Sequence, residues 1–516
     1  MLIHSLLLSC ANDNNGVGGS SDCPPTHALV DEISDNPPSP EPADDNVDKP
    51  FFPFDEPFTS LFLTEYPYDP PAPVFNEASV HDPSVFRVGN TFYVIGSHMS
   101  MAKTENFMEW TQVSAYVSSF NRLAPNAEEE FKEAFEWAQT DTFWAGDIQH
   151  MPDGRFFMYY CNCEGSKPLG NIGLAISDHP EGPYLNQGIF LKSGMSGTSH
   201  DGSRYDATHH PNAVDPHAFF DSEEQFWMVY GSYSGGIYIL RMDPETGLPE
   251  EGQGYGEKLL GGNHSRIEGP YIIYSPDTEY YYMFLTFGGF GHDGGYNIRV
   301  MRSEKPNGPY YDAAGNAMID AMGPRGSFFA DEYIEPFGTK IMGGFRFLGK
   351  DGERKKSYVS PGHNSAYYDA KSGRYFMFFH TRFTFGQGHE IRVHEMFLNE
   401  NGWFVVSPFR FAGAGHRSFE PEQVPGSWRL INHGQSINPA PIESELYELN
   451  ADGTITGFSD SSWALDENGF SFIITLEGTQ YKGVMLNSWD ENLDSWIMSF
   501  TALSEDGISL WGAAFP

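Results

Sequence analysis

The chain has 516 residues, more than one hydrophobic core usually serves, so we expect two domains or one large repeat fold with an appendage. Aromatic residues make up 15% of the chain, and 55 glycines and 36 prolines favour many short strands joined by tight turns over long helices. The formal net charge of −40 repels nucleic acid, anionic lipid and polyanionic substrates, whereas a neutral ligand is unaffected.

The first ten residues, MLIHSLLLSC, form a short apolar run that resembles the lipobox of bacterial lipoproteins. Residues 1–10 are then a lipoprotein-type signal in which Cys10 would be lipidated. No Lys or Arg precedes Lys49, so either the true start lies upstream or the resemblance is accidental. Residues 11–68 are acidic and proline-rich, which predicts a disordered tether and favours the first interpretation. We therefore expect an extracellular or bacterial cell-surface or periplasmic protein that meets a membrane only through Cys10.

From Asp69 a hairpin pattern recurs five times, which predicts an all-β fold. Each copy has a polar residue at a strand entrance, a short strand, a Gly or Asp turn and an aromatic run, and several copies are followed by a second strand pair. Four strands repeated five times predict a five-bladed β-propeller over residues 69–418. The copies begin HDPSVFRVGNTFYVIGS, WAGDIQHMPDGRFFMYYCN, VDPHAFFDSEEQFWMVYGS, IEGPYIIYSPDTEYYYMFLTFGG and GHNSAYYDAKSGRYFMFFHTRF.

Two further elements are expected. Residues 126–141 (NAEEEFKEAFEWAQTD) predict a helix, capped by Asn126, with an apolar face that begins at Phe131. This helix leads into Trp144, so it either walls a ligand groove or packs on the blade. Residues 419–516 alternate as strands with Asp-Gly turns and predict a small β-barrel or sandwich with no cluster of titratable groups.

Alignment of the five copies brings one titratable residue of each copy to the entrance of an innermost strand. Because the innermost strands line the propeller axis, these residues converge at one end of the channel. Turn formation explains any one of them, but hardly all five together. The residues are Asp82, Asp147, Asp215, Glu268 and His363.

Crowded carboxylates shift one another's pKa values, so that one stays protonated while another ionises. An acid facing a base is what glycoside hydrolysis needs. The nearby aromatic residues Phe143, Trp144 and Tyr233 suit stacking on neutral sugar rings, although packing between blades explains most aromatic residues of the chain.

The motifs HDPSV, FWAGDI, NAVDP, IEGPY, YNIRV and PGHNS…FHTRF resemble those of glycoside hydrolase family 43, most of all its two-domain endo-α-1,5-L-arabinanases. The resemblance runs from about Asp69 to the C-terminus. It implies an inverting mechanism with Asp82 as general base, Glu268 as general acid and Asp215 as the carboxylate that tunes the pKa of the acid and orients it. The carboxyl groups of an inverting pair lie ~6.5–9.5 Å apart. One departure is Gly146, where the family has proline, and it bears on subsite shape alone.

The resemblance also implies a metal ion and a set of substrate contacts. His363 matches a histidine that holds a calcium ion on the propeller axis largely through waters, with Asp82, Asp147 and Asp215 behind those waters. The alternative is a neutral channel histidine. The expected substrate-binding residues are His81, Trp144, Asp147, Asn212, Ser232, Tyr233 and Arg382.

The sequence therefore predicts a monomeric, calcium-containing extracellular hydrolase that cleaves internal α-1,5-L-arabinofuranosidic bonds of arabinan or arabino-oligosaccharides with inversion. Two alternatives stay open. An exo-acting arabinofuranosidase or xylosidase would differ in the loops around the funnel, which the sequence does not reveal. A non-catalytic glycan-binding surface lipoprotein would have no need of the acid–base pair Asp82 and Glu268.

Overall fold

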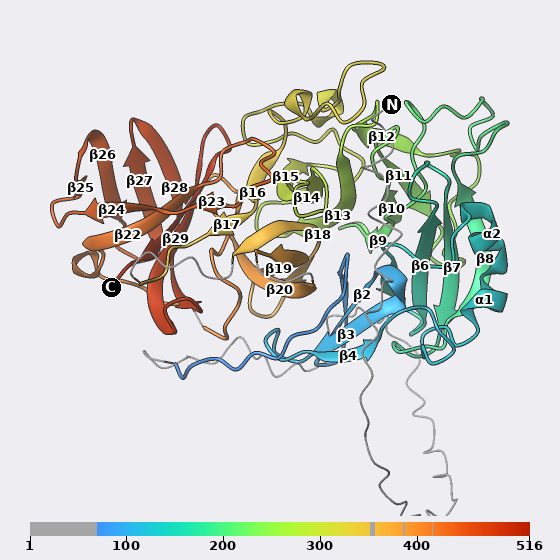
Figure 1. Cartoon of the computed structure of the whole chain (residues 1–516), viewed down its shortest axis with the longest axis horizontal. Coiled ribbons are helices and arrows are strands. Elements are labelled where there is room, and N and C mark those ends of the chain that lie inside the picture. Colours follow the sequence, from blue (N-terminus) through green and yellow to red (C-terminus); the bar gives the residue numbers. More distant parts are fainter. Residues whose placement is uncertain (1–69, 351–356, 385–387, 415) are drawn as a thin grey trace, which may run out of the picture.

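The computed structural model describes residues 70–350, 357–384, 388–414 and 416–516. These residues form two β-rich bodies, a propeller and a barrel (Figure 1). The signal and the tether predicted over residues 1–68 lie outside the described residues. Within the described part of the chain, no helix is long and apolar enough to cross a membrane.

The propeller has five blades, as predicted. Blades 1 to 4 are four-stranded antiparallel sheets in which strands that follow one another along the chain pair side by side. Their strands are β1 (Ser84–Val88), β2 (Thr91–Gly96), β3 (Ser100–Thr104) and β4 (Thr111–Ser114); β5 (Asp147–His150), β6 (Phe156–Cys163), β7 (Gly170–Ser177) and β8 (Leu185–Lys192); β9 (His217–Phe220), β10 (Phe226–Tyr230), β11 (Ile237–Met242) and β12 (Glu257–Leu260); and β13 (Ile267–Ser275), β14 (Tyr280–Phe287), β15 (Asn297–Ser303) and β16 (Thr339–Met342).

Blade 5 is a six-stranded sheet that includes one strand from beyond the propeller. The short strand β23 pairs in parallel with β17, through Phe345 opposite Ile442. Blade 5 also closes the ring, because the ring of Phe107 from blade 1 lies 4.9 Å from that of Phe376 and 5.1 Å from that of Phe378. The strands of blade 5 are β17 (Phe345–Arg346), β18 (Tyr358–Asp369), β19 (Arg374–Phe383), β20 (His389–Leu398), β21 (Phe404–Val406) and β23 (Ile442–Glu443).

Burial follows the position of a strand within its blade. The second strands β6 and β10 are buried along their whole length because each blade packs between two neighbours, whereas the outer strand β8 is largely accessible. Strands covered on both faces read as continuous apolar runs instead of alternating patterns. This explains the aromatic runs such as FFMYYCNC.

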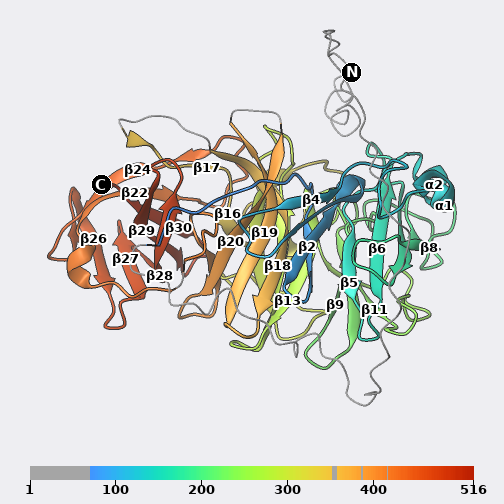
Figure 2. The ribbon, with the colours of Figure 1, turned by 90° about the horizontal axis from the view of Figure 1, so that it is seen from below.

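The C-terminal body is a closed eight-stranded barrel, which decides between the two predicted forms. Trp428, Phe472 and Phe500 are in its core. The barrel lies beside blade 5 (Figure 2), and Lys340 of β16 donates hydrogen bonds to the carbonyls of His433 and Ser436, at 2.9 and 2.8 Å. The barrel strands are β22 (Gly426–Asn432), β24 (Glu445–Leu449), β25 (Thr454–Ile455), β26 (Phe458–Leu465), β27 (Ser471–Leu476), β28 (Thr479–Asp490), β29 (Ser495–Ser504) and β30 (Ser509–Ala514).

The predicted single helix is wrong in two respects. The segment forms two short helices, α1 (Ala127–Glu130) and α2 (Lys132–Ala138), because Phe131 leaves the helical conformation at φ −106°, ψ 21°. Asn126 makes no side-chain capping bond. The indole of Trp137 donates to the carbonyl of Gly170 at 3.0 Å, so α2 packs on blade 2.

Candidate active site

A small cavity on the propeller axis is lined by the entrances to the innermost strands. Asp82, Asp215, Gly269 and His363 all line it, and all four have left-handed backbone, with φ of 58°, 55°, 61° and 46°. For a residue other than glycine this conformation costs of order 1 kcal/mol or more, and it persists only where the surroundings impose it. The same strained turn, repeated in four blades, brings these distant residues together.

Two predicted members of the ring are displaced by one residue. Glu268 precedes the left-handed Gly269, and Asp147 follows Gly146, which lines the cavity in blade 2. Gly269 is suited to its place because a Cβ there would come within 3.1 Å of the His363 ring. Glu268 is therefore on β13, beside the axial cavity instead of on its lining.

Asp82 is held as a carboxylate by the groups around it. Its Oδ2 accepts hydrogen bonds from Ser97 Oγ at 2.6 Å and from His81 Nδ1 at 2.7 Å. Its buried Oδ1 has no hydrogen-bond partner and lies 3.2 Å from His363 Nδ1. Burial by itself raises the pKa of Asp82, but the neighbouring imidazoles, first that of His363, outweigh it and hold that pKa well below its usual range. An ionised carboxylate with one uncommitted oxygen is suited to act as a base.

Glu268 and Asp215 have the opposite character. Ser232 Oγ donates to Glu268 Oε2 at 2.8 Å, and the Tyr296 hydroxyl donates to Oε1. Burial raises the pKa of Glu268 to about 8; the bond from Ser232 opposes this rise and the charge of Asp82 adds to it.

Asp215 accepts the N–H of Gly269 at 3.3 Å. Burial, then the charges of Glu268 and Asp82, raise the pKa of Asp215 well above its usual range. Because two buried carboxyl groups cannot easily ionise together, this pair retains a proton at neutral pH. The site thus combines an ionised carboxylate with a protonated one.

Three of the predicted substrate-binding residues are engaged by the protein itself. Asp147 accepts the N–H of Ala218 at 2.8 Å and the hydroxyl of Ser84, and so links blades 1, 2 and 3. Asn212 accepts a hydrogen bond from Ser193 Oγ at 2.9 Å. Trp144 is half-buried and packs against the core shared by blades 2 and 3.

The remaining predicted residues lie around the acid and the base. The Tyr233 hydroxyl donates to the Gly288 carbonyl at 3.0 Å, and Arg382 Nε donates to the Phe290 carbonyl at 3.2 Å. The Phe290 ring in turn meets the edge of His81 at 5.7 Å. Ser232, His81 and His363 contact the carboxyl groups, as described above. The structure therefore brings most of the predicted site together.

Sequence reasoning assigned no role to several residues of this site. Tyr296 holds Glu268, and His380 accepts the backbone N–H of Asp82 at 3.1 Å. Both residues are within the motifs YNIRV and FHTRF, so the signal was present but indicated the family alone. Ser97 donates to Asp82 of its own blade, and Asn364 lines the axial cavity; neither role has a pattern in the sequence that points to it.

Two groups of atoms offer ligands for a cation. His81, Asp82 and His380 offer ligand atoms that all lie within 4.8 Å of one another. However, His380 Nδ1 already accepts the Asp82 N–H, and the two imidazoles stack at 4.0 Å. Two nitrogens and one carboxylate suit a transition metal better than calcium, which prefers oxygen ligands.

The axial cavity fits calcium better. Asn364 is 2% exposed and lines the cavity, and neither its Oδ1 nor its Nδ2 has a hydrogen-bond partner in the protein. Asp82 lines the same cavity, and its Oδ1 accepts no hydrogen bond. The cavity has about 20 Å³ of space for the centre of a water-sized sphere, enough for one water or ion. These are oxygen donors that a hydrated hard cation would satisfy.

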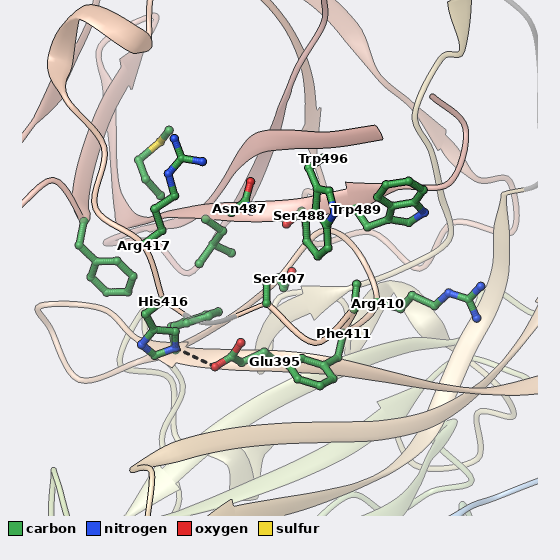
Figure 3. Close-up of a pocket in the computed structure, with 16 residues that line it drawn as sticks. Glu395, Ser407, Arg410, Phe411, His416, Arg417, Asn487, Ser488, Trp489 and Trp496 are labelled. Carbon is green, nitrogen blue, oxygen red and sulfur yellow. Dashed lines mark hydrogen bonds and ion pairs between the residues drawn. The ribbon is translucent and has the colours of Figure 1, made fainter. Parts of the chain in front are cut away.

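A larger cavity lies where blade 5 meets the barrel, with Trp489 and Trp496 on one side and Glu395 on the other (Figure 3). Both oxygens of Glu395 accept hydrogen bonds from Arg374, each at 2.6 Å, and His416 Nε2 lies 2.8 Å from Oε1. Among the residues that the structure describes, no second carboxyl group lines this cavity. It therefore has no acid–base pair, and the axial site is the candidate for hydrolysis.

A five-bladed propeller with an ionised carboxylate beside a protonated one on its axis has the chemistry of a glycoside hydrolase. Residues 71–332 match the model of glycosyl hydrolases family 43. Residues 408–512 match the C-terminal lipocalin-like domain of that family, in agreement with the closed eight-stranded barrel. The chain belongs to glycosyl hydrolase family 43.

Similar proteins cover nearly the whole described chain. An extracellular endo-α-(1→5)-L-arabinanase 2 of Bacillus subtilis is 52% identical over 86% of this chain and 94% of its own length. An extracellular endo-α-(1→5)-L-arabinanase of Thermotoga petrophila is 46% identical over 88% of this chain and 97% of its own length. The crystal structure of a family 43 protein from Bacillus licheniformis, 52% identical, covers 86% of this chain and 99% of its own with a TM-score of 0.83.

Proposed function

We propose that the protein is an extracellular endo-α-1,5-L-arabinanase that hydrolyses internal bonds of arabinan with inversion. The chemistry is supported by pKa shifts in opposite directions: the pKa of Asp82 is lowered, whereas the pKa values of Glu268 and Asp215 are raised. The substrate and the internal cleavage come from relatives that are 52% and 46% identical and are named endo-arabinanases. Both relatives are also named extracellular, which supports the same location for this protein. We propose in addition that a lipid on Cys10 anchors the chain to a membrane.

In the proposed reaction, a water attacks the anomeric carbon from the side of Asp82. Asp82 Oδ1 takes the proton of that water as the new carbon–oxygen bond forms. Glu268 gives its proton to the glycosidic oxygen as the old bond breaks, so one water is consumed and both carboxyl groups exchange protonation states. Proton exchange with solvent restores them.

The surrounding residues keep the two carboxyl groups in these states. Ser232 and Tyr296 fix the carboxyl group of Glu268. Asp215 accepts the N–H of Gly269, the residue after Glu268, and this hydrogen bond fixes the strand. Because the carboxyl groups of Asp215 and Glu268 are buried near each other, they cannot easily ionise together, and a proton stays on the pair. His81 and Ser97 leave Asp82 only one oxygen for the attacking water.

We also propose that the axial cavity holds a hydrated calcium ion near His363 and Asn364. The unpartnered oxygens of Asn364 and Asp82 support this, and Asp215 lines the same cavity. Asp147 does not line it, and its oxygens are used by Ser84 and Ala218. When bound, the ion supplies positive charge that favours the ionised form of Asp82.

The anomeric configuration of the first product tests the mechanism. We expect proton NMR of an arabinan digest to show the β-anomer of the new reducing end first, with the α-anomer growing later by mutarotation. The control is the same mixture after equilibration, which fixes the final ratio. If the α-anomer appears first, the reaction proceeds with retention and Asp82 is not a general base acting on water.

A further inference from the structure

The segment between β15 and β16 folds back toward the acid. It includes the short helices Met318–Asp320 and Asp331–Tyr333, seen in yellow at the top of Figure 1. The Gly323 N–H donates to Ser265 Oγ at 2.9 Å, and Asn263 Nδ2 donates to the Gly323 carbonyl at 2.9 Å. The segment is thereby attached to residues 263–265, immediately before Glu268.

A second anchor lies further along the same segment. Arg266 binds both carboxylate oxygens of Asp331, with Nε 2.9 Å from Oδ1 and Nη2 bonded to Oδ2. A bidentate pair of this kind fixes direction as well as distance. Because Arg266 is two residues before Glu268 on the chain, the segment between Gly323 and Asp331 has a fixed place beside the acid.

Between these anchors two phenylalanines join a cluster of four rings. Phe328 and Phe329 have ring centroids 4.2 Å apart. Phe329 meets the ring of Tyr233 edge-on at 5.4 Å, and Phe328 lies 5.0 Å from His264. Tyr233 follows Ser232, the residue that hydrogen-bonds Glu268. The cluster is therefore connected to the acid from both blades 3 and 4.

The exposure of Phe328 and the backbone conformation of Phe329 differ from those of ordinary core residues. The side chain of Phe328 is 56% exposed, although a large apolar ring is usually buried. Phe329 has left-handed backbone with φ 57°, which a bulky residue rarely adopts. Backbone strain of this kind persists only where the surrounding structure imposes it, and strained residues are concentrated at functional sites. A flat apolar ring that is held rigid and left open to solvent suits stacking on the face of a sugar.

We propose that the rings of Phe328, Phe329, His264 and Tyr233 form the platform that binds the departing part of the arabinan chain. This proposal rests on the proposed function, because Glu268 as acid defines the leaving-group side. In an inverting reaction the acid and the base act on opposite faces of the anomeric carbon. The sugars beyond the departing oxygen therefore lie on the side of Glu268, where these rings are held. An enzyme that cuts internal bonds must bind those departing sugars.

The test compares two substrates that differ in the group that departs. Linear arabinohexaose places sugars on both sides of the cleaved bond, whereas α-arabinobiosyl fluoride releases only fluoride. We expect Phe328→Ala to lower kcat/KM on arabinohexaose about three- to tenfold and to leave the fluoride reaction unchanged. Phe328→Trp retains a stacking ring and should keep most of the wild-type rate. Leu446→Ala, at a side chain 59% exposed on the barrel, is the control for loss of an exposed apolar group.

The outcomes separate this proposal from the proposed function. If Phe328→Ala matches the wild type on arabinohexaose, or loses equal factors on both substrates, the platform on the departing side is rejected. An unchanged melting temperature of each variant shows that the fold is intact. If the wild-type protein hydrolyses neither arabinohexaose nor arabinobiosyl fluoride, the proposed function fails, independently of Phe328.

Discussion

Glu268 serves as an acid only while it is protonated, and burial raises its pKa to about 8. We therefore expect kcat/KM on arabino-oligosaccharides to fall as the pH rises through about 8, because ionisation removes the proton that the leaving oxygen needs. The apparent pKa belongs to the coupled pair with Asp215. The measurement is a pH–rate profile, with circular dichroism at each pH to exclude unfolding. An alkaline limit near pH 5 would show that Glu268 is an ordinary exposed carboxyl group instead.

The role of Gly269 can be tested by comparison with Gly373, a glycine that also has a positive φ but has no side chain close to it. Gly269 has φ 61°, and an added Cβ would lie 3.1 Å from the ring of His363. Gly373 has φ 68° and nothing within 4 Å of such a Cβ. Both alanine variants should lose about 1–2 kcal/mol of stability through strain, but only Gly269→Ala should also lower the rate of hydrolysis, tenfold or more. Equal rates for the two variants would mean that the contact with His363 does not position the acid.

The chemistry of individual residues was predictable to different degrees. Asp82 and Asp215 could be found because a repeated turn made them align, whereas Glu268 lies one residue before the turn position that Gly269 occupies. Tyr296 and His380 lie within the motifs YNIRV and FHTRF, which indicated the family but not that Tyr296 holds Glu268 or that His380 accepts the N–H of Asp82 from another blade. Asn364 lies within PGHNS, and only the structure shows that it lines the axial cavity. Phe328 and Phe329 were missed because aromatic residues are abundant in the chain, and only exposure and backbone strain distinguish these two.

Among the elements, strands were predictable and the helix was less so. Turn residues and aromatic runs mark every blade. The predicted helix divides at Phe131 because that ring packs edge-on against Phe143 and Tyr160, at 5.0 and 4.9 Å, and tertiary packing overrides helical propensity. The pairing of β23 with β17 has no sequence signal, because each of these strands has two residues.

The innermost strands together create the cavity for the proposed calcium ion. We expect millimolar calcium to raise the melting temperature of chelator-treated protein, because a ligand that binds only the folded state stabilises it. Asn364→Ala should reduce this increase, since it removes one unpartnered oxygen from the cavity. Magnesium at equal concentration is the control. A melting temperature that calcium leaves unchanged, in protein shown to be metal-free by elemental analysis, would rule out the axial ion.

For the whole molecule, the arrangement of propeller and barrel was only partly predictable. The change of pattern after Phe419 indicated a second β body, but not that the connection between its strands β22 and β24 would add β23 to blade 5, or that Lys340 would bind carbonyls of the same connection. Such contacts depend on how two bodies meet, and neither body reveals them alone. The −40 charge has a clearer consequence at this scale, because it leaves a neutral polysaccharide as an acceptable substrate and disfavours a polyanion.

The most direct test of the central claim is a time course of linear arabinan with the purified full chain, with products separated by chromatography and Glu268→Gln as the inactive control. We expect a mixture of arabino-oligosaccharides from the earliest times, and a rate for the variant about 10²–10⁴-fold lower because its amide has no acidic proton to give. Arabinose as the sole early product would contradict internal cleavage, and a variant as fast as the wild type would remove Glu268 from the role of acid.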